Sequence, residues 1–254
     1  MKNSIPTAVV NPAQSLAQNR CSRLPVLPGE IADVRTFAGA QAPSTEQIFH
    51  PVADRLSIFF FIRGTGSVVA EEKTFTASPW ALFIPAFRAP FSFTCAPDVP
   101  LEYLEIELAV TPEDAKDLEA TKKLLPYFIR YADCRTYREA IKSEKTVNRT
   151  LVPEKIIPRF CMGSVETAGP DAVGAHRHPM LEQLFFGLKD NLCDVTADAK
   201  AVSFGEFVLL HVPSGSEHGV RVNTGCKLHY LWLDFFKDRE GVEWIAKMHK
   251  PNDA

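Results

Sequence analysis

The chain has 254 residues, of which 46% are hydrophobic, and its formal net charge is −3 at neutral pH. That length fits one large or two modest domains, and the apolar content is enough to fill a sizeable core. The small negative charge argues against nucleic acid and against an anionic membrane surface as partners. The longest apolar runs, such as Leu56 to Ile62, are far too short to span a bilayer.

The six cysteines are scattered and none belongs to a CxxC pair, so a thiolate zinc site is not expected. The N-terminus shows no apolar signal core, which predicts a cytoplasmic protein with reduced cysteines. Residues 1–28 are rich in Ser, Asn, Gln and Pro and show little periodicity. We expect them to form an arm that is either loose or laid across a neighbouring subunit.

Residues 29–110 show the pattern of short β-strands separated by turns. Arg55 to Ile62 is rich in β-forming residues and ends at the turn sequence of residues 63–66, and Leu101 to Leu108 alternates cleanly. We assign this segment to a first β-barrel.

Residues 111–146 are expected to connect two barrels. Thr111 is a typical N-cap, followed by proline and two acidic residues, which predicts a helix from there to about Leu125. A second short helix is expected around Arg135 to Lys142.

Residues 147–238 again show short strands, among them one expected from Ile157 to Val165, and form the second predicted barrel, with 239–254 as a terminal helix and tail. Asp238 is expected to cap that helix. Val242, Ile245 and Met248 recur at helical spacing, so the helix should pack on a barrel face.

Histidines gather in the second barrel, which holds five of the seven between residues 176 and 229. Side chains alternate along a strand, so His176 and His178 should point the same way, and Glu182 keeps that parity. A turn at residues 213–215 would bring in His218 from a second strand. Imidazole and carboxylate together suit a divalent transition metal.

These two segments resemble the paired motifs of the cupin superfamily: a glycine, HxH and a glutamate, and later a glycine, PxG and a histidine. The resemblance implies an all-β-dominated chain of two tandem cupin barrels (double-stranded β-helix, jelly-roll), with a connecting and a C-terminal helix. It also implies one divalent transition metal (Fe, Mn, Ni or Zn) held by His176, His178, Glu182 and His218. The pattern departs from the family in two places. Residues 189–191 replace a glycine-rich hairpin, and the segment between Gly205 and Pro213 is longer than is usual in the second motif.

An internal repeat supports two barrels. Residues 59–62 align with 185–188 and residues 79–85 with 207–213, at offsets of 126 (188 minus 62) and 128 (213 minus 85). In the first copy Pro90 stands where His218 is, Leu56 falls near the place of Glu182, and only His50 remains, about where His176 sits. The first barrel is therefore expected to hold no metal and to serve structure, dimer packing or closure over the other site.

Five further residues are candidates for lining the pocket, although packing is the favoured role for each: Arg159, Gln183, His211, His229 and Trp232. Gln183 should face away from Glu182.

The resemblance implies a metal-dependent enzyme acting on a small polar or anionic metabolite, with dioxygenase-type oxidoreductase chemistry slightly favoured over isomerase or decarboxylase chemistry. The alternatives are a non-catalytic metal-containing binding or sensing protein and, less well supported, a storage protein. A homodimer with a small-molecule ligand, and no nucleic acid or membrane partner, is the expected assembly.

Overall fold

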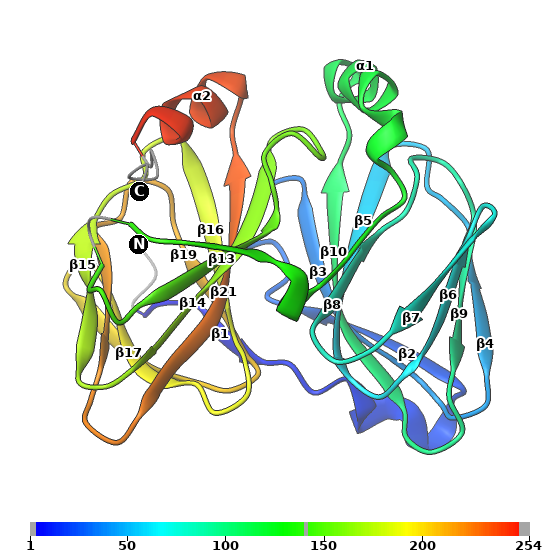
Figure 1. Cartoon of the computed structure of the whole chain (residues 1–254), viewed down its shortest axis with the longest axis horizontal. Coiled ribbons are helices and arrows are strands. Elements are labelled where there is room, and N and C mark those ends of the chain that lie inside the picture. The colour runs from blue at the N-terminus through cyan, green and yellow to red at the C-terminus, as the bar shows by residue number, and fades with distance from the viewer. Residues whose placement is uncertain (1–3, 140–141, 249–254) are drawn as a thin grey trace. The chain divides into compact units, whose positions relative to one another are not determined.

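The computed structural model describes residues 4–139 and 142–248. The chain divides into two compact units. We call Val10–Asp133 the N-terminal barrel, and Cys134 onward together with the described residues up to Val9 the C-terminal barrel. Each unit consists of two antiparallel sheets that enclose a core, as in a jelly roll (Figure 1).

The N-terminal barrel has a six-stranded and a four-stranded sheet. The larger has the order β11-β8-β5-β10-β3-β2, with bounds β2 Cys21–Val26, β3 Val34–Gln41, β5 Arg55–Arg63, β8 Ala81–Ile84, β10 Leu101–Ala109 and β11 Tyr127–Arg130. The smaller has the order β4-β9-β6-β7, with bounds β4 Glu46–Phe49, β6 Gly66–Ala70, β7 Lys73–Ala77 and β9 Phe91–Cys95.

The C-terminal barrel has a seven-stranded and a four-stranded sheet. The larger has the order β1-β19-β16-β21-β14-β13-β12, with bounds β1 Thr7–Val9, β12 Arg135–Tyr137, β13 Val147–Val152, β14 Phe160–Ala168, β16 Leu181–Gly187, β19 Val208–Val212 and β21 Lys227–Phe236. The smaller has the order β15-β20-β17-β18, with bounds β15 Asp171–His176, β17 Leu192–Ala197, β18 Lys200–Gly205 and β20 His218–Val222.

The two barrels repeat one topology. The order β8-β5-β10-β3-β2 corresponds strand for strand to β19-β16-β21-β14-β13, and β4-β9-β6-β7 corresponds to β15-β20-β17-β18. The strand register agrees as well. Phe59 and Phe185 are aligned in the internal repeat, and they lie opposite Glu105 of β10 and Trp232 of β21, the corresponding strands. The internal repeat seen in the sequence is therefore a repeat of structure.

Alternation along the strands decides which residues fill each core. In the N-terminal barrel the inward positions carry closely packed aromatic rings: Phe59, Phe61, Phe83, Phe93 and Tyr103. In the C-terminal barrel the inward positions are mostly aliphatic with a few aromatics, among them Phe185, Val195, Phe204, Leu210, Val220 and Tyr230. Fully burying such a side chain contributes about 1.5–3 kcal/mol, so these clusters dominate the stability of each barrel.

The first helix begins where the sequence predicts and ends earlier. α1 spans Pro112–Ala120, and the Thr111 side chain accepts a hydrogen bond from the backbone N–H of Asp114 while the Asp114 carboxylate accepts one from that of Thr111. The expected end at Leu125 is wrong, because a separate 3-10 turn, η2 (Lys122–Leu124), follows. The other 3-10 segments are η1 (Pro12–Gln18) and η3 (Tyr131–Asp133).

The second helix agrees with its prediction. α2 spans Arg239–Met248, and the Asp238 carboxylate accepts a hydrogen bond from the backbone N–H of Gly241 at 2.9 Å. Val242 packs against a small cluster of Cys161, Leu181 and Phe236. The side chains of Ile245 and Met248 lie outside the described residues.

Three sequence expectations need correction. The expected N-terminal arm instead contributes β1, which pairs with β19 of the same chain, and β2, which pairs with β3. The helix expected around Arg135 to Lys142 begins as strand β12, because Arg135–Tyr137 pairs with β13, and residues 140–141 lie outside the described part. The strand expected from Ile157 starts at Phe160 after a turn.

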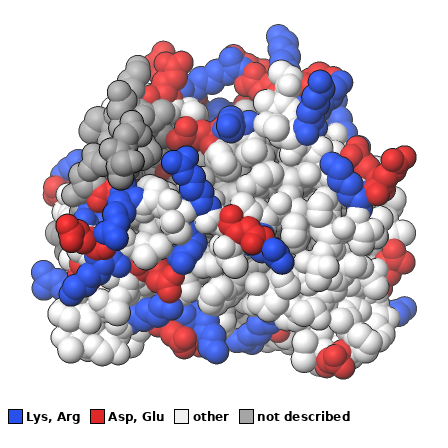
Figure 2. All heavy atoms as spheres, in the orientation of Figure 1, with Lys and Arg blue, Asp and Glu red and all other residues white. Residues whose placement is uncertain are grey.

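Charged side chains are spread over the surface. On the face shown in Figure 2, basic and acidic side chains are interspersed, in keeping with the small net charge. Within the described residues, neither helix is long and apolar enough to cross a membrane.

Candidate metal centre

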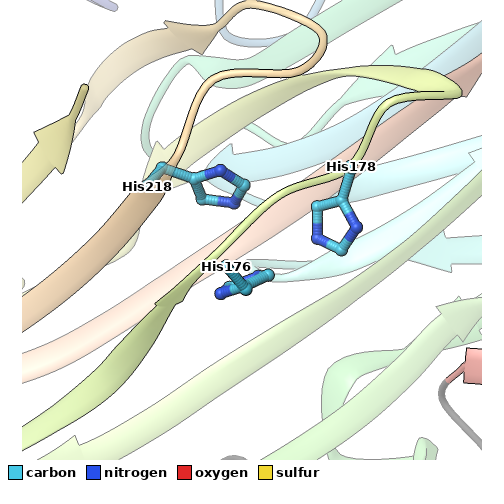
Figure 3. Close-up of side chains that lie close together, drawn as sticks. All are labelled: His176, His178 and His218. Carbon is cyan, nitrogen blue, oxygen red and sulfur yellow. The ribbon is translucent and has the colours of Figure 1, made fainter.

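Three histidine side chains converge in the C-terminal barrel (Figure 3). His176 is the last residue of β15, His178 follows in the next loop, and His218 opens β20 as the cross-strand partner of His176. Their ligand atoms all lie within 4.8 Å of one another, and the rings of His176 and His218 are 4.5 Å apart between centroids. This spacing lets one ion contact all three rings, so the group could hold a metal.

A β-bulge turns His176 into the barrel. Val173 pairs with Val220 and His176 pairs with His218, so β15 carries one more residue than β20 over this interval. Val173 and Val220 both face the core, and simple alternation would leave His176 on the outer face. The extra residue reverses that parity and brings His176 to the same side as His218.

Backbone carbonyls select the tautomer of two of these histidines. Nδ1 of His176 lies 2.8 Å from the carbonyl oxygen of Gly174, and Nδ1 of His218 lies 3.0 Å from that of Ser216. A carbonyl only accepts, so each Nδ1 carries the proton and each Nε2 keeps a lone pair. This arrangement commonly orients histidines that ligate metals.

The His218 ring is suited to a cation for a second reason. Its Nε2 is buried and has no hydrogen-bond partner in the structure. Burial, and secondarily the neighbouring His176, lower the pKa of His218 to about 4, so the ring is neutral at pH 7. A buried lone pair without a donor is costly, and a bound cation would satisfy it. The histidines therefore fit the divalent ion that the sequence predicts.

The fourth predicted ligand, Glu182, is not part of the group that the three histidines form. Its carboxylate accepts hydrogen bonds from Nε2 of His211 at 3.0 Å and from the backbone N–H of Ser214 at 2.8 Å. Although burial opposes the shift, these two hydrogen bonds lower the pKa of Glu182. Counting parity from His178 fails because residues 177–180 form a loop, across which strand alternation does not hold.

Gln183 occupies the inward position that was assigned to Glu182. It alternates with Phe185, which belongs to the barrel core and whose ring lies 6.1 Å from that of His218. The Gln183 amide N–H donates to Asp234 at 2.7 Å, whereas its Oε1 is buried with no hydrogen-bond partner. This amide oxygen is the same kind of unsatisfied acceptor as Nε2 of His218.

Asp234 is a buried acid that the sequence analysis missed. It lies opposite Gln183 in the β16–β21 pair and is 5% exposed. The signal was present, because it is a single acidic residue inside the apolar run of residues 228–236. An isolated acid in a core strand requires a partner or a function.

A buried ion pair extends this polar interior. Lys142 Nζ lies 2.9 Å from Glu139 Oε2, with side chains 7% and 10% exposed, and it also donates to Asn148 at 2.7 Å. Burial lowers the pKa of Lys142 although Glu139 and Asp234 oppose the shift. Lys142 forms a backbone bridge to Val173 in β15, the strand that delivers His176. Sequence analysis placed this segment in a connecting helix and gave it no role.

The remaining predicted pocket residues take different positions. Trp232 faces the core, where its ring lies over Gly163. His211 and His229 alternate with core residues and therefore lie on the other face of their strands, and burial lowers the pKa of His229 to about 4. Arg159 lies in the turn before β14, where its carbonyl accepts from the N–H of Phe236.

α2 supplies an aromatic neighbour to the histidines. The Trp244 ring lies 6.2 Å from that of His178, in an edge-to-face arrangement at 85°. Trp244 also packs against the cluster of Cys161, Leu181 and Phe236, so the helix is anchored beside the site.

Solved structures identify this architecture. No family model matches the chain, and no curated protein is similar to it in sequence. A cupin 2 conserved barrel domain protein from Leptotrichia buccalis superimposes with a TM-score of 0.65 and 15% identity, covering 93% of this chain and 99% of that one. The chain has the fold of the cupin superfamily. It is built as a bicupin, with two barrels in one chain.

Two further solved structures show the same likeness. AerE from Microcystis aeruginosa has a TM-score of 0.66 and 9% identity, covering 92% of this chain and 98% of that one. A variant of the oxalate decarboxylase from Bacillus subtilis has a TM-score of 0.62 and 14% identity, covering 94% and 78%. At such identities the likeness establishes the bicupin fold and leaves the reaction to be argued from the site.

Proposed function

We propose that the C-terminal barrel is the metal-dependent active site of an enzyme acting on a small anionic metabolite by proton transfer, in an isomerisation or a decarboxylation. His176, His178 and His218 are the proposed ligands, with the Gln183 oxygen as a fourth. The observation that supports the reaction class is the buried Asp234 bonded to Gln183, because Asp234 would then lie next to one of the proposed ligands.

The ligand set determines the charge of the site. Neutral imidazoles and an amide oxygen cancel none of the charge of a divalent ion, whereas Glu182 as a ligand would have cancelled part of it. Such a site attracts an anionic substrate. A divalent ion bound there would polarise a carbonyl or carboxylate oxygen of the substrate. Imidazole donors suit Zn, Ni and Fe, and an oxygen donor also suits Mn.

Residues of the barrel supply the rest of the chemistry. Asp234 can accept a proton at a carboxylate oxygen, and Gln183 orients that carboxylate by donating to Oδ1. We further propose that the buried Lys142, which pairs with Glu139 and whose pKa is lowered by burial, returns a proton or stabilises a negative charge on the substrate. Trp244 contributes an apolar ring beside His178.

Metal analysis combined with substrate depletion tests the proposal. The purified chain is expected to hold about one equivalent of metal, which His176→Ala and His218→Ala should lose while remaining folded. His50→Ala, which changes the single histidine near the matching place in the N-terminal barrel, is the control and should keep the metal. Asp234→Asn should also keep the metal.

The chain is then incubated with a mixture of small organic acids, and depletion is followed by mass spectrometry. Consumption of an acid without oxygen that is lost in His218→Ala and in Asp234→Asn supports the proposal. Oxygen-dependent consumption with redox-active iron or copper would replace it with dioxygenase chemistry. Tight ligand binding with no product over hours would indicate a sensing protein.

A further inference from the structure

The N-terminal barrel contains a cavity of about 270 Å³ formed entirely by its own residues. The exposed residues from His50 to Val52 form part of its lining. Its apolar walls include Phe49, Leu56 and Phe91, and its charged lining consists of Arg23, Arg55, Arg88, Glu105 and Glu107. The size suits a small metabolite rather than a cofactor.

The cavity lies at the end of the barrel that matches the candidate metal centre. Ser57 lies opposite Glu107 in the first barrel, and Gln183 lies opposite Asp234 in the second, at equivalent places in the repeated topology. Both Ser57 and Glu107 line the cavity. The N-terminal barrel therefore has a cavity at this end, although Pro90 stands where the sequence alignment places His218.

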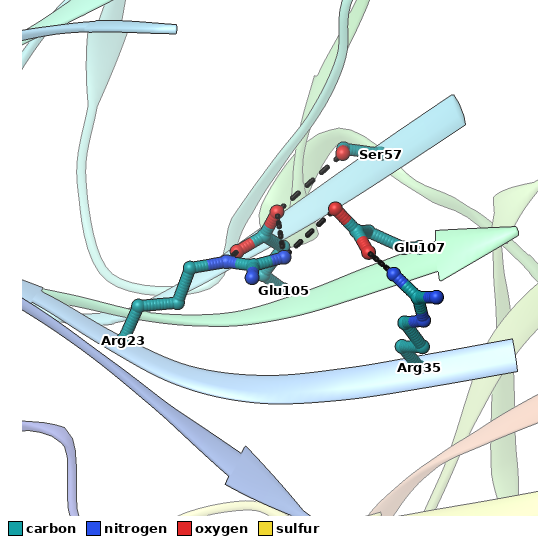
Figure 4. Close-up of polar contacts among 5 residues, drawn as sticks. All are labelled: Arg23, Arg35, Ser57, Glu105 and Glu107. Atoms are coloured by element: carbon teal, nitrogen blue, oxygen red, sulfur yellow. Dashed lines mark hydrogen bonds and ion pairs between the residues drawn. The ribbon is translucent and has the colours of Figure 1, made fainter. Parts of the chain in front are cut away.

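The two carboxylates of the lining are already neutralised. The Arg23 guanidinium lies between them, donating to Glu105 at 2.7 Å and pairing with Glu107 at 2.8 Å, as Figure 4 shows. Arg23 is held over the Phe37 ring, 3.3 Å from its centroid, and Arg35 lies on the other side of Glu107 at 3.9 Å. Glu105 and Glu107 therefore form their ion pairs with arginines other than Arg55.

Arg55 is a cation without a counter-ion. Among the described residues it forms no ion pair, and its Nη1 is buried with no hydrogen-bond partner. Oε1 of Gln47, another lining residue, is likewise buried and unpartnered. With three arginines against two glutamates, the lining has an excess of one positive charge.

We infer that this cavity is a second ligand site, which binds a small carboxylate carrying a hydroxyl or amino group. The carboxylate accepts hydrogen bonds from Arg55, the hydroxyl or amino group donates to Gln47, and the short carbon body lies against Phe49 and Phe91. A carboxylate matches the planar fork of a guanidinium, and burial strengthens that contact. The site uses no metal and is independent of the histidines of the other barrel.

Calorimetric titration with lactate tests this inference. The full chain is first stripped of metal, so that lactate cannot bind by chelation, and lactamide serves as the uncharged probe of similar shape. Lactate should bind with a Kd on the order of 1 mM or tighter, and lactamide at least about tenfold more weakly. Titration of the His218→Ala chain should give the same lactate Kd.

Arg55→Gln should weaken lactate at least about tenfold. The matched control is Arg63→Gln, which changes an arginine on the same strand that pairs with Glu102 and does not line the cavity. Should Arg55→Gln fail to fold, Gln47→Leu keeps the arginine and should still weaken lactate. Equal binding of lactate and lactamide, equal effects of Arg55→Gln and Arg63→Gln, loss of binding in His218→Ala, or no binding at tens of millimolar would each overturn the inference.

Discussion

The Glu182 carboxylate accepts a hydrogen bond from Nε2 of His211 at 3.0 Å, on the face of β16 opposite to Gln183. The same carboxylate oxygen also accepts from the backbone N–H of Ser214, in the turn that leads to His218. Glu182 therefore fixes a turn next to the proposed site, and we expect it not to ligate the ion.

Glu182→Ala should keep the metal and lose stability. His211 and the Ser214 N–H would lose their acceptor, so the free energy of unfolding should fall by about 1–3 kcal/mol. Urea denaturation and elemental analysis of the purified variant measure the two effects separately. A folded variant without metal would show that Glu182 is a ligand after all.

Substitution of Gln183, unlike that of Glu182, is expected to change metal binding. Gln183→Leu removes the buried amide oxygen and should weaken metal binding by about 10–100-fold. Gln183→Glu places a second carboxylate beside Asp234, and the repulsion between like charges should lower the Tm of the metal-free chain. Added metal should restore it, so the Tm increase on adding Zn²⁺ should be larger in Gln183→Glu than in the wild-type chain. Equal increases would argue against contact between this side chain and the ion.

Asp171 is expected to make the free energy of unfolding depend on pH. Although burial opposes the shift, hydrogen bonds from Ser143, Thr167, Thr146 and the Ala172 N–H lower its pKa. A carboxyl with a lowered folded pKa stabilises the protein above the unfolded value of 3.8, and the stabilisation is lost as pH falls through the folded pKa.

Asp171→Asn should therefore cost about 1 kcal/mol at pH 7, a modest value because the site is partly exposed to solvent. The difference from wild type should disappear in strong acid. Denaturation curves at several pH values measure it, with Asp190→Asn as a control at an exposed position. A cost that stays constant down to pH 2 would contradict the assignment.

The N-terminal segment is predicted to stabilise the C-terminal barrel. Thr7–Val9 pairs with β19, the Pro6 carbonyl accepts from the His211 N–H at 3.0 Å, and Ile5 is 6% exposed in the core. Deleting residues 1–9 should lower the free energy of unfolding by about 3–5 kcal/mol, from lost apolar burial and lost backbone hydrogen bonds.

The deletion also leaves the edge of β19 unpaired, so concentration-dependent association is expected in light scattering. Val9→Ala is the matched control, because Val9 is 71% exposed and its side chain contributes little. A deletion variant as stable and as monodisperse as this control would contradict the proposed role of β1.

The local sequence determined much of this molecule. Alternating strands and turn residues, which depend on near neighbours in the chain, predicted short β-strands, and the resemblance to the cupin motifs implied how those strands fold. The N-cap at Thr111 and the cap at Asp238 were read correctly for the same reason. The three histidines were recognised because HxH and a following PxG turn are short-range patterns whose geometry a strand and a turn fix.

Only the tertiary structure decided which of the two neighbours, Glu182 or Gln183, faces the core of the barrel. Parity cannot be counted through the loop of residues 177–180, so the choice between Glu182 and Gln183 depends on where β16 resumes and which face meets the core. The pairing of β1 with β19 and the meeting of Arg23 with Glu105 join residues more than 80 positions apart. No local pattern encodes such contacts, because they arise only when packed strands bring distant residues together.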